Sequence, residues 1–288
     1  MSNLMSGCVT ALPVERTKVV SGGAILVVYS VGQGRPDAPT LVFLHAGVSD
    51  SRLWAKQFET FGPDHRVVAY DRRGFGATAA VDEHFSSVDD LIAVLDTLVI
   101  TRAVLIGCSQ GGRIALDATL AHPHRVAGLV LVAAAIGGAP DSTAADPRLK
   151  ALVAAYEEAC VTDDVDALNR IEAHVWLDGP FALEGRVAGA ERALFLTMNR
   201  IVLGGPKLGS TDVPDTAYRR LADVAVPTLL MWGPLDVPSV VANMRYAAAT
   251  IPEARACELI GVAHLPSLEA PDRFDAALAT FLHDVDLA

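Results

Sequence analysis

Cysteine is scarce in this chain, and the cysteines present lie far apart. The 288 residues include four of them, none in a Cys-x-x-Cys pair: Cys8, Cys108, Cys160 and Cys257. Disulfide-dependent secreted proteins carry a denser cysteine framework, and zinc sites need ligands at short, fixed spacings. We therefore expect a cytoplasmic protein without a metal site.

The chain also lacks an excess of positive charge and a long apolar run. It has 23 Lys and Arg against 34 Asp and Glu, which gives a formal net charge of -11. An acidic protein repels nucleic-acid phosphates, so nucleic-acid binding is not expected. The longest apolar run, residues 126–140, contains glycines and is too short to span a bilayer. The first residues show no secretion-signal pattern, and we expect no membrane association.

Short apolar segments rich in β-branched residues alternate with helical patterns along much of the chain. The expected strands are residues 24–32, 40–47, 66–76 (running into a turn), 103–109, 125–136, 226–233 and 254–261, and the expected helices are 87–98, 110–123, 237–252 and 271–285. Continuous apolar strands are typical of a parallel sheet that is buried on both faces. The alternation predicts an α/β fold with a mostly parallel sheet flanked by helices.

This alternation stops after Gly138. Residues 139–222 show mainly helical patterns, and within them 204–214 has the composition of a loop; the helices are expected at 146–160, 164–177, 188–203 and 215–224. We therefore predict one α/β core domain formed by residues 1–138 and 223–288, with a helical insertion at 139–222.

Two side chains that could attack a carbonyl stand side by side in the segment "GCSQGG". A nucleophile elbow is a sharp turn between a strand and a helix, and the residues two before and two after the nucleophile must be very small. Gly107 and Gly111 meet this need around Ser109, whereas the corresponding neighbours of Cys108 are larger. The spacing predicts Ser109 as the nucleophile and Cys108 as a buried apolar residue.

A serine nucleophile needs a base, and the base needs an acid that orients it. In this architecture they follow along the chain in the order serine, acid, histidine. His264 follows the last expected strand, where a sheet delivers residues to its carboxyl edge, and we predict it as the base. Asp236 follows the preceding strand and is the predicted acid. Asp141, after the strand before that, is the alternative acid.

The oxyanion of the tetrahedral intermediate needs backbone N–H donors. We predict one from Gln110, directly after the nucleophile, and a second from Gly47 in the loop after residues 40–44. His45 lies in the same loop and is expected to brace it rather than to act as a base.

Several motifs together carry a family resemblance: "LHAGVSDSRLW", "DRRGFGAT", "GCSQGG", "GPLDVP" and "GVAHLPSLEAP". From about residue 17 to 285 the chain resembles an α/β-hydrolase with a helical cap that covers the active site. Many members have His-Gly-Gly or His-Gly-x-Pro where this chain has His45-Ala46-Gly47. The "DRRGFG" turn is structural in the family, so the resemblance implies no catalytic role for Arg72 or Arg73.

Within the superfamily, the core resembles 3-oxoadipate enol-lactonases and hydrolases of small esters or acyl-homoserine lactones. Haloalkane dehalogenases and epoxide hydrolases need an aspartate at the elbow, so Ser109 argues against both. Gln110 departs from the Gly-Gly-Ser-Trp-Gly elbow of proline iminopeptidases.

We therefore predict a serine hydrolase that cleaves a small-molecule ester or lactone without a cofactor. A neutral imidazole base implies that activity falls below about pH 6.5. Two alternatives stay open: a C–C bond hydrolase, lyase or acyltransferase that uses the same residues, and a ligand-binding receptor. Trp176, Phe181 and Met198 of the insertion could line an acyl pocket or could only pack the cap against the core. The oligomeric state, monomer or homodimer, also stays open.

Overall fold

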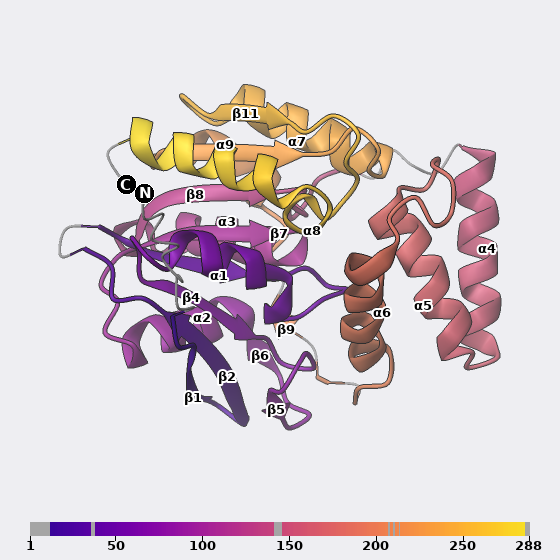
Figure 1. The fold of residues 1–288 in the computed structure, drawn as a ribbon, viewed down its shortest axis with the longest axis horizontal. Helices are drawn as coiled ribbons and strands as arrows, with labels where there is room; N and C mark the ends of the chain where they lie inside the picture. The colour runs from indigo at the N-terminus through magenta and orange to yellow at the C-terminus, as the bar shows by residue number, and fades with distance from the viewer. Residues whose placement is uncertain are drawn as a thin grey trace, which may run out of the picture.

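The computed structural model of the chain describes residues 12–35, 38–140, 146–206, 208–209, 211–212 and 214–285. A sheet with the strand order β1-β2-β4-β3-β7-β8-β10-β11 forms its centre (Figure 1), and β5 pairs with β2 beside it. The β1–β2, β2–β4 and β2–β5 pairs are antiparallel, and every pair from β4–β3 to β10–β11 is parallel. The strands of this sheet are β1 (Glu15–Ser21), β2 (Ala24–Val31), β3 (Thr40–Leu44), β4 (Val67–Asp71), β5 (Ala79–Ala80), β7 (Ala103–Cys108), β8 (Val126–Val132), β10 (Thr228–Trp232) and β11 (Arg255–Glu258). The predicted α/β fold class is confirmed.

Helices cover both faces of the sheet because its central strands bury side chains on both. In β3, Leu41 and Phe43 belong to one apolar cluster with α1 and α9, whereas Val42 and Leu44 belong to the opposite one with α2, α3 and α7. Alternate residues of a strand point to opposite faces, so the continuous apolar pattern predicted this two-sided burial. The core helices are α1 (Ala55–Phe61), α2 (Ser87–Thr97), α3 (Gln110–Ala121), α7 (Pro238–Thr250), α8 (Pro266–Glu269) and α9 (Pro271–Asp284), with the 3-10 helices η1 (Ser51–Trp54) and η2 (Pro123–Arg125).

Three further helices stand beside the sheet, at the right of Figure 1: α4 (Pro147–Val161), α5 (Val165–Ala173) and α6 (Gly189–Leu203). The middle helix α5 packs against α4 and α6, and Asn199 of α6 donates from Nδ2 to Oδ1 of Asn169 in α5 at 3.1 Å. They fall within the predicted insertion, whose boundaries stay a prediction. Its last part, the 3-10 helix η5 (Ala217–Asp223), instead buries Ala217 and Leu221 in the core cluster with α3 and α7.

The expected helix 164–177 does not continue as an α-helix to its end. It changes at His174 into a π-helical turn, η4 (His174–Asp178), which ends at Gly179 with φ +93°. A Cβ on Gly179 would lie 2.4 Å from the carbonyl oxygen of Leu235. The α-helix therefore ends where the chain passes close to the core, a tertiary contact that helical spacing does not encode.

Three strand pairs, β1–β2, β2–β5 and β6–β9, were not predicted from the sequence. Strand β1 forms a hairpin with β2 through Gly22 and Gly23, and Gly22 has φ +50°. Two consecutive glycines between strands are a hairpin signal. The expected loop 204–214 contains β9 (Thr211–Asp212), which pairs in parallel with β6 (Phe85–Ser86). Pairing of two residues with two leaves too little apolar alternation to be recognised.

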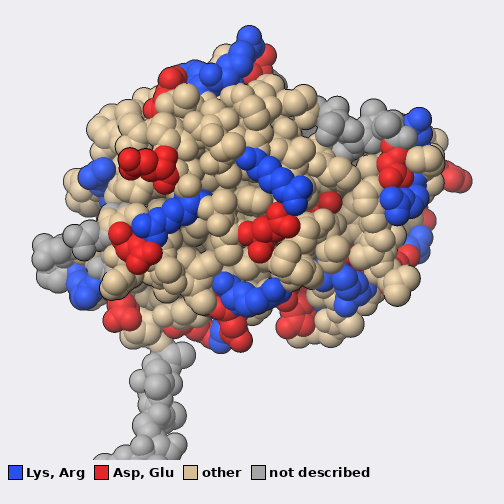
Figure 2. Space-filling view, turned by 90° about the horizontal axis from the view of Figure 1, so that it is seen from above, with Lys and Arg blue, Asp and Glu red and all other residues tan. Residues whose placement is uncertain are grey.

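Charges of both signs are interspersed on the face shown in Figure 2. Ion pairs at the surface include Arg245 with Glu258 at 2.8 Å. Of the helices in the described parts of the chain, none combines the length and the apolar character needed to cross a bilayer.

Candidate active site

Ser109 lies on a strained turn between β7 and α3. Its backbone has φ +53° and ψ -117°, a region that side-chain-bearing residues adopt at a cost of about 1–3 kcal/mol. The turn is held on both sides, because Ser109 N–H donates to the Val132 carbonyl at 2.9 Å and the Ser109 carbonyl accepts from Ala135 N–H at 3.0 Å. Such over-determined strain is common at functional sites.

The glycines around this turn stand where the backbones nearly touch. A Cβ on Gly107 would lie 2.3 Å from the Gly111 carbonyl oxygen, and one on Gly111 would lie 2.2 Å from the Leu44 carbonyl oxygen. These are the positions that the elbow spacing reserves for glycine when Ser109 is the central residue.

Cys108 lies on the inner side of the same turn. It is fully buried, and its thiol donates to the His264 carbonyl oxygen at an S···O distance of 3.6 Å. Burial raises the pKa of the Cys108 thiol well above its ordinary value, so the reactive thiolate is suppressed. The contact also shows that the backbone of His264 lies directly beside the end of β7.

Asp236 and His264 meet at the carboxyl ends of neighbouring strands. Asp236 follows β10 and His264 follows β11, and Nδ1 of His264 lies 2.7 Å from Oδ2 of Asp236. The other oxygen of Asp236 accepts from Val237 N–H at 2.7 Å, and both residues are only 2% exposed. A carboxylate at this distance holds the proton on Nδ1 and leaves Nε2 as the basic nitrogen. The alternative acid, Asp141, lies outside the described residues.

The loop after β3 contacts the elbow at the two predicted oxyanion donors. A Cβ on Gly47 would lie 2.8 Å from the side-chain amide of Gln110, so Gly47 and Gln110 are direct neighbours. His45 is fully buried; its Nδ1 lies 2.8 Å from the Ala46 carbonyl and its Nε2 accepts from Arg72 N–H at 3.1 Å. Burial, with the nearby Arg72 cation, holds the pKa of His45 well below its ordinary value. A neutral imidazole with both ring nitrogens hydrogen-bonded fits the bracing role that the sequence predicted.

Arg72 has a role that sequence reasoning missed. Its buried guanidinium donates from Nη2 to the carbonyl oxygens of His45 at 3.2 Å and Ala46 at 3.1 Å, and from Nη1 to Oε1 of Gln110 at 3.2 Å. Burial lowers the pKa of Arg72 to about 10, so it stays charged at neutral pH. Arg72 therefore ties the loop after β3 to the elbow. Arg73, in contrast, forms a structural ion pair with Asp90 at 2.8 Å, and the sequence "RR" does not distinguish the two.

The three predicted pocket residues of the insertion have very different surroundings. Trp176 is half-buried, and its ring centroid lies 4.5 Å from that of His264. Phe181 is exposed, with the Arg148 guanidinium 3.9 Å from its ring centroid. Met198 has no exposed surface and packs in the cluster that contains Leu177. Trp176 thus contacts the predicted base, and substrate contact stays a prediction for all three.

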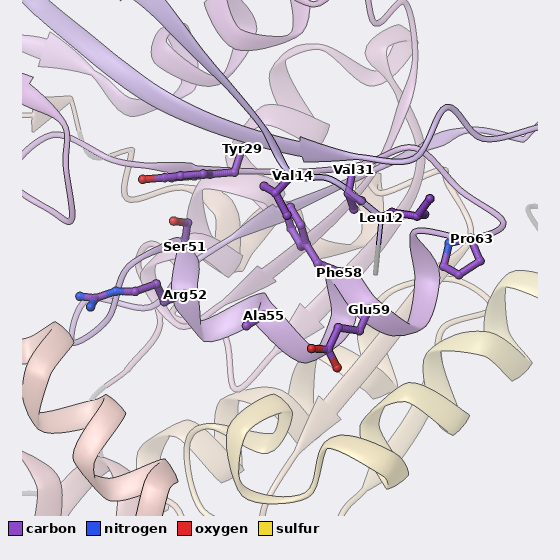
Figure 3. Close-up of a pocket in the computed structure, with 10 residues that line it drawn as sticks. All are labelled: Leu12, Val14, Tyr29, Val31, Ser51, Arg52, Ala55, Phe58, Glu59 and Pro63. Atoms are coloured by element: carbon purple, nitrogen blue, oxygen red, sulfur yellow. The ribbon is translucent and has the colours of Figure 1, made fainter. Parts of the chain in front are cut away.

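A cavity lies between β2 and α1, lined by none of these residues. Its volume is about 680 Å³, and Figure 3 shows Tyr29, Val31 and Phe58 among its lining side chains. None of the predicted catalytic residues lines it. Within the described residues, no three His, Cys, Asp or Glu side chains are grouped closely enough to hold a metal ion.

The comparison with protein families decides the classification. A family model described as "Alpha/beta hydrolase family" matches residues 41–277. The chain belongs to the alpha/beta hydrolase family. As a member it is a hydrolase, and the matched region begins in β3 and ends in α9.

Named relatives extend this result. The chain is 29% identical over 265 residues to the pimeloyl-[acyl-carrier protein] methyl ester esterase of Edwardsiella ictaluri, which covers 88% of this chain and 95% of that protein. It is 24% identical over 262 residues to 3-oxoadipate enol-lactonase 1 of Acinetobacter baylyi, covering 88% and 91%. Among solved structures, Est816, described as an N-acyl homoserine lactone degrading enzyme, is 26% identical, covers 92% of this chain and 100% of its own, and has a TM-score of 0.72.

Proposed function

We propose that this hydrolase cleaves a small carboxylic ester or lactone through an acyl-enzyme on Ser109. The observation that carries the proposal is the Asp236–His264 hydrogen bond of 2.7 Å beside a serine on a strained strand-to-helix turn. The esterase and lactonase names of the relatives support the substrate class.

In the first half of the reaction, Ser109 Oγ attacks the carbonyl carbon while Nε2 of His264 takes the hydroxyl proton. Asp236 holds the Nδ1–H group and stabilises the imidazolium. The N–H groups of Gly47 and Gln110 donate to the oxyanion, whose charge is largest in the tetrahedral state, so they lower the barrier. The intermediate collapses as the C–O bond to the leaving group breaks and His264 returns its proton to the leaving oxygen.

In the second half, His264 removes a proton from water, and the resulting hydroxide attacks the carbonyl carbon of the acyl group bound to Ser109 Oγ. Collapse of the second tetrahedral intermediate breaks the bond to Oγ and returns the proton to it. With a lactone, the leaving alkoxide is part of the acyl chain, so the product is a single hydroxy acid. These steps need no group outside the chain other than water.

A paired substitution tests the proposal. On short p-nitrophenyl esters and simple lactones, we expect Ser109→Ala to lower kcat by at least about 10⁴-fold, as removal of a triad nucleophile does. Cys108→Ala, one residue away, should change kcat by less than about 3-fold, because the buried thiol packs there and donates only a long, weak hydrogen bond to the His264 carbonyl. The reversed outcome contradicts the proposal. Turnover of a β-diketone alone would instead favour a C–C bond hydrolase, and binding without turnover a receptor.

A further inference from the structure

Glu269 of α8 holds the backbone on both sides of the proposed base. Its Oε2 accepts from Ala263 N–H at 2.8 Å and its Oε1 accepts from Leu265 N–H at 3.0 Å, so His264 lies between its two hydrogen-bonded neighbours. The Glu269 side chain is 1% exposed. A buried carboxylate that accepts two N–H groups fixes a loop strongly, because charge-assisted hydrogen bonds are about twice as strong as neutral ones.

The same carboxylate forms an ion pair with Arg186, which lies between η4 and α6 in the cap. The guanidinium of Arg186 also donates from Nη2 to the Leu177 carbonyl at 2.7 Å, from Nε to the Asp178 carbonyl at 2.6 Å, and from Nη1 to the Gly261 carbonyl at 2.9 Å. Arg186 therefore joins the end of η4 to the loop that carries His264.

The segment around Arg186 is itself fixed by a buried carboxylate. Asp178 is fully buried and accepts from Gly185 N–H at 2.8 Å, from Val187 N–H at 2.9 Å and from Nη1 of Arg192 at 2.8 Å. The two N–H donors flank Arg186, as those of Glu269 flank His264. Two buried carboxylates thus hold the two segments that the Arg186–Glu269 pair connects.

Trp176 provides a second contact between η4 and the loop that carries His264. It lies in η4, two residues before Asp178, and its ring contacts the imidazole of His264 with centroids 4.5 Å apart and planes inclined by 47°. A π-helical turn re-aims side chains compared with an α-helix, and such turns are frequent at functional sites. The proposed base is therefore in contact with the same segment that Arg186 holds in place.

We infer that Arg186 and Glu269 are positioning residues for the reaction. Their ion pair holds the His264 loop and the η4 turn together and so keeps His264 aimed at Ser109. The inference rests on the proposed function, since it assigns His264 as the base. Neither residue touches the reacting atoms; both act through the backbone of the base and through Trp176.

Matched substitutions in the full chain test this inference. With a small p-nitrophenyl ester, Arg186→Met and Glu269→Gln should each lower kcat by about 10- to 100-fold, which is the scale of a misplaced catalytic group. KM should change by less than about 3-fold in either direction. Arg186→Lys should recover part of the loss. Arg200→Met is the control, because Arg200 is an arginine of α6 whose ion pair with Asp166 is exposed and joins α6 to α5 rather than to the His264 loop.

The pH dependence of kcat/KM separates positioning from loss of folding. The charged or titratable groups placed around His264 are Asp236 after β10, Cys108 in β7, Glu269 in α8 and Arg186 in the cap. The acid limb is the fall of kcat/KM at low pH as His264 takes up a proton. Arg186→Met leaves the negative charge of Glu269 unpaired, which favours protonated His264 and should move the acid limb to higher pH. Glu269→Gln leaves a cation and should move it to lower pH, whereas the double variant should return it near its original position with kcat still low.

The outcomes distinguish this inference from the proposed function. If the unaltered protein turns over esters and both single variants behave like Arg200→Met, the positioning role is refuted and the proposed function stands. A fall in kcat with an unmoved acid limb in both variants, or an equal fall in the control, would also overturn it. If the unaltered protein has no ester or lactone turnover, the proposed function itself fails.

Discussion

The elbow and the cap are held in place by different forces. Every residue of β7 is buried, and the elbow after it is set by backbones that approach so closely that a Cβ at Gly111 would lie 2.2 Å from another carbonyl oxygen. In the cap, α4 buries only Leu149 and Ala159 of its 15 residues. Its η4 turn depends on buried polar contacts of Asp178 and Arg186. The difference teaches that the turn carrying the proposed nucleophile is fixed by packing, whereas the η4 segment beside the proposed base is fixed by charges.

The largest effect is expected from a substitution at Gly111, in the tightly packed elbow. Gly111→Ala places a methyl group against the Leu44 and His45 carbonyl oxygens, at 2.2 and 2.7 Å. Because the backbone cannot move aside as a side chain can, we expect the free energy of unfolding to fall by more than about 3 kcal/mol. Urea unfolding measures this loss. The hydrolytic activity should be lost as well. Gly204→Ala at the end of α6, where the nearest atom is 3.3 Å away, is the control and should cost less than about 1 kcal/mol.

Asp178 provides the corresponding test in the cap. Asp178→Ala leaves two N–H donors and the Arg192 cation without their buried acceptor, which should cost about 2–3 kcal/mol. Hydrogen exchange should accelerate in η4 and α6 and stay unchanged in β7 and β8. The exposed Asp166→Ala should change little. Equal acceleration in the sheet would show that cap and core are one cooperative unit.

A smaller effect of opposite sign is expected at Asp117 in α3. Burial raises the pKa of Asp117 to about 6, although Arg113 lies 3.7 Å away. The folded state therefore binds the proton more tightly than the unfolded chain, so stability is lost as pH rises from about 4 to 6. Asp117→Asn removes this cost and should stabilise the protein by about 1–2 kcal/mol at pH 8.

Urea unfolding of the Asp117→Asn variant at pH 8 and at pH 4 checks this sign. Most of the gain should disappear at pH 4, where the folded state carries the proton and the unfolded chain, with the ordinary Asp pKa of 3.8, carries it in part. A gain that is the same at both pH values would mean that burial of the charge is not its cause.

Most of the core and the candidate residues could be predicted from the sequence because both depend on local patterns, whereas strand β1 and helix α1 were not predicted. Apolar runs marked the parallel strands, and glycine spacing marked Ser109. Asp236 and His264 follow their strands directly, and the structure brings them into one hydrogen bond. Their catalytic roles stay predictions.

The polar contacts of Arg72 and Arg186 that sequence reasoning missed join segments far apart in the chain. Arg72 reaches Gln110 across 38 positions and Arg186 reaches Glu269 across 83. A single sequence contains no pattern that pairs such residues. The η4 turn was missed for a related reason, since Gly179 passes against Leu235 of the core. Polar and tertiary contacts between distant segments thus limit what the pattern of one chain predicts.

Mapping a covalent adduct tests the central claim, that Ser109 is the nucleophile, most directly. After labelling with a fluorophosphonate, trypsin should release residues 103–113, "AVLIGCSQGGR", in which Ser109 and Cys108 are the only candidate nucleophiles. Fragmentation of this peptide in a mass spectrometer distinguishes the two. The account predicts one phosphonyl group on Ser109, an unmodified Cys108, and no labelling after His264→Gln. An adduct on Cys108, or on a different peptide, would contradict it.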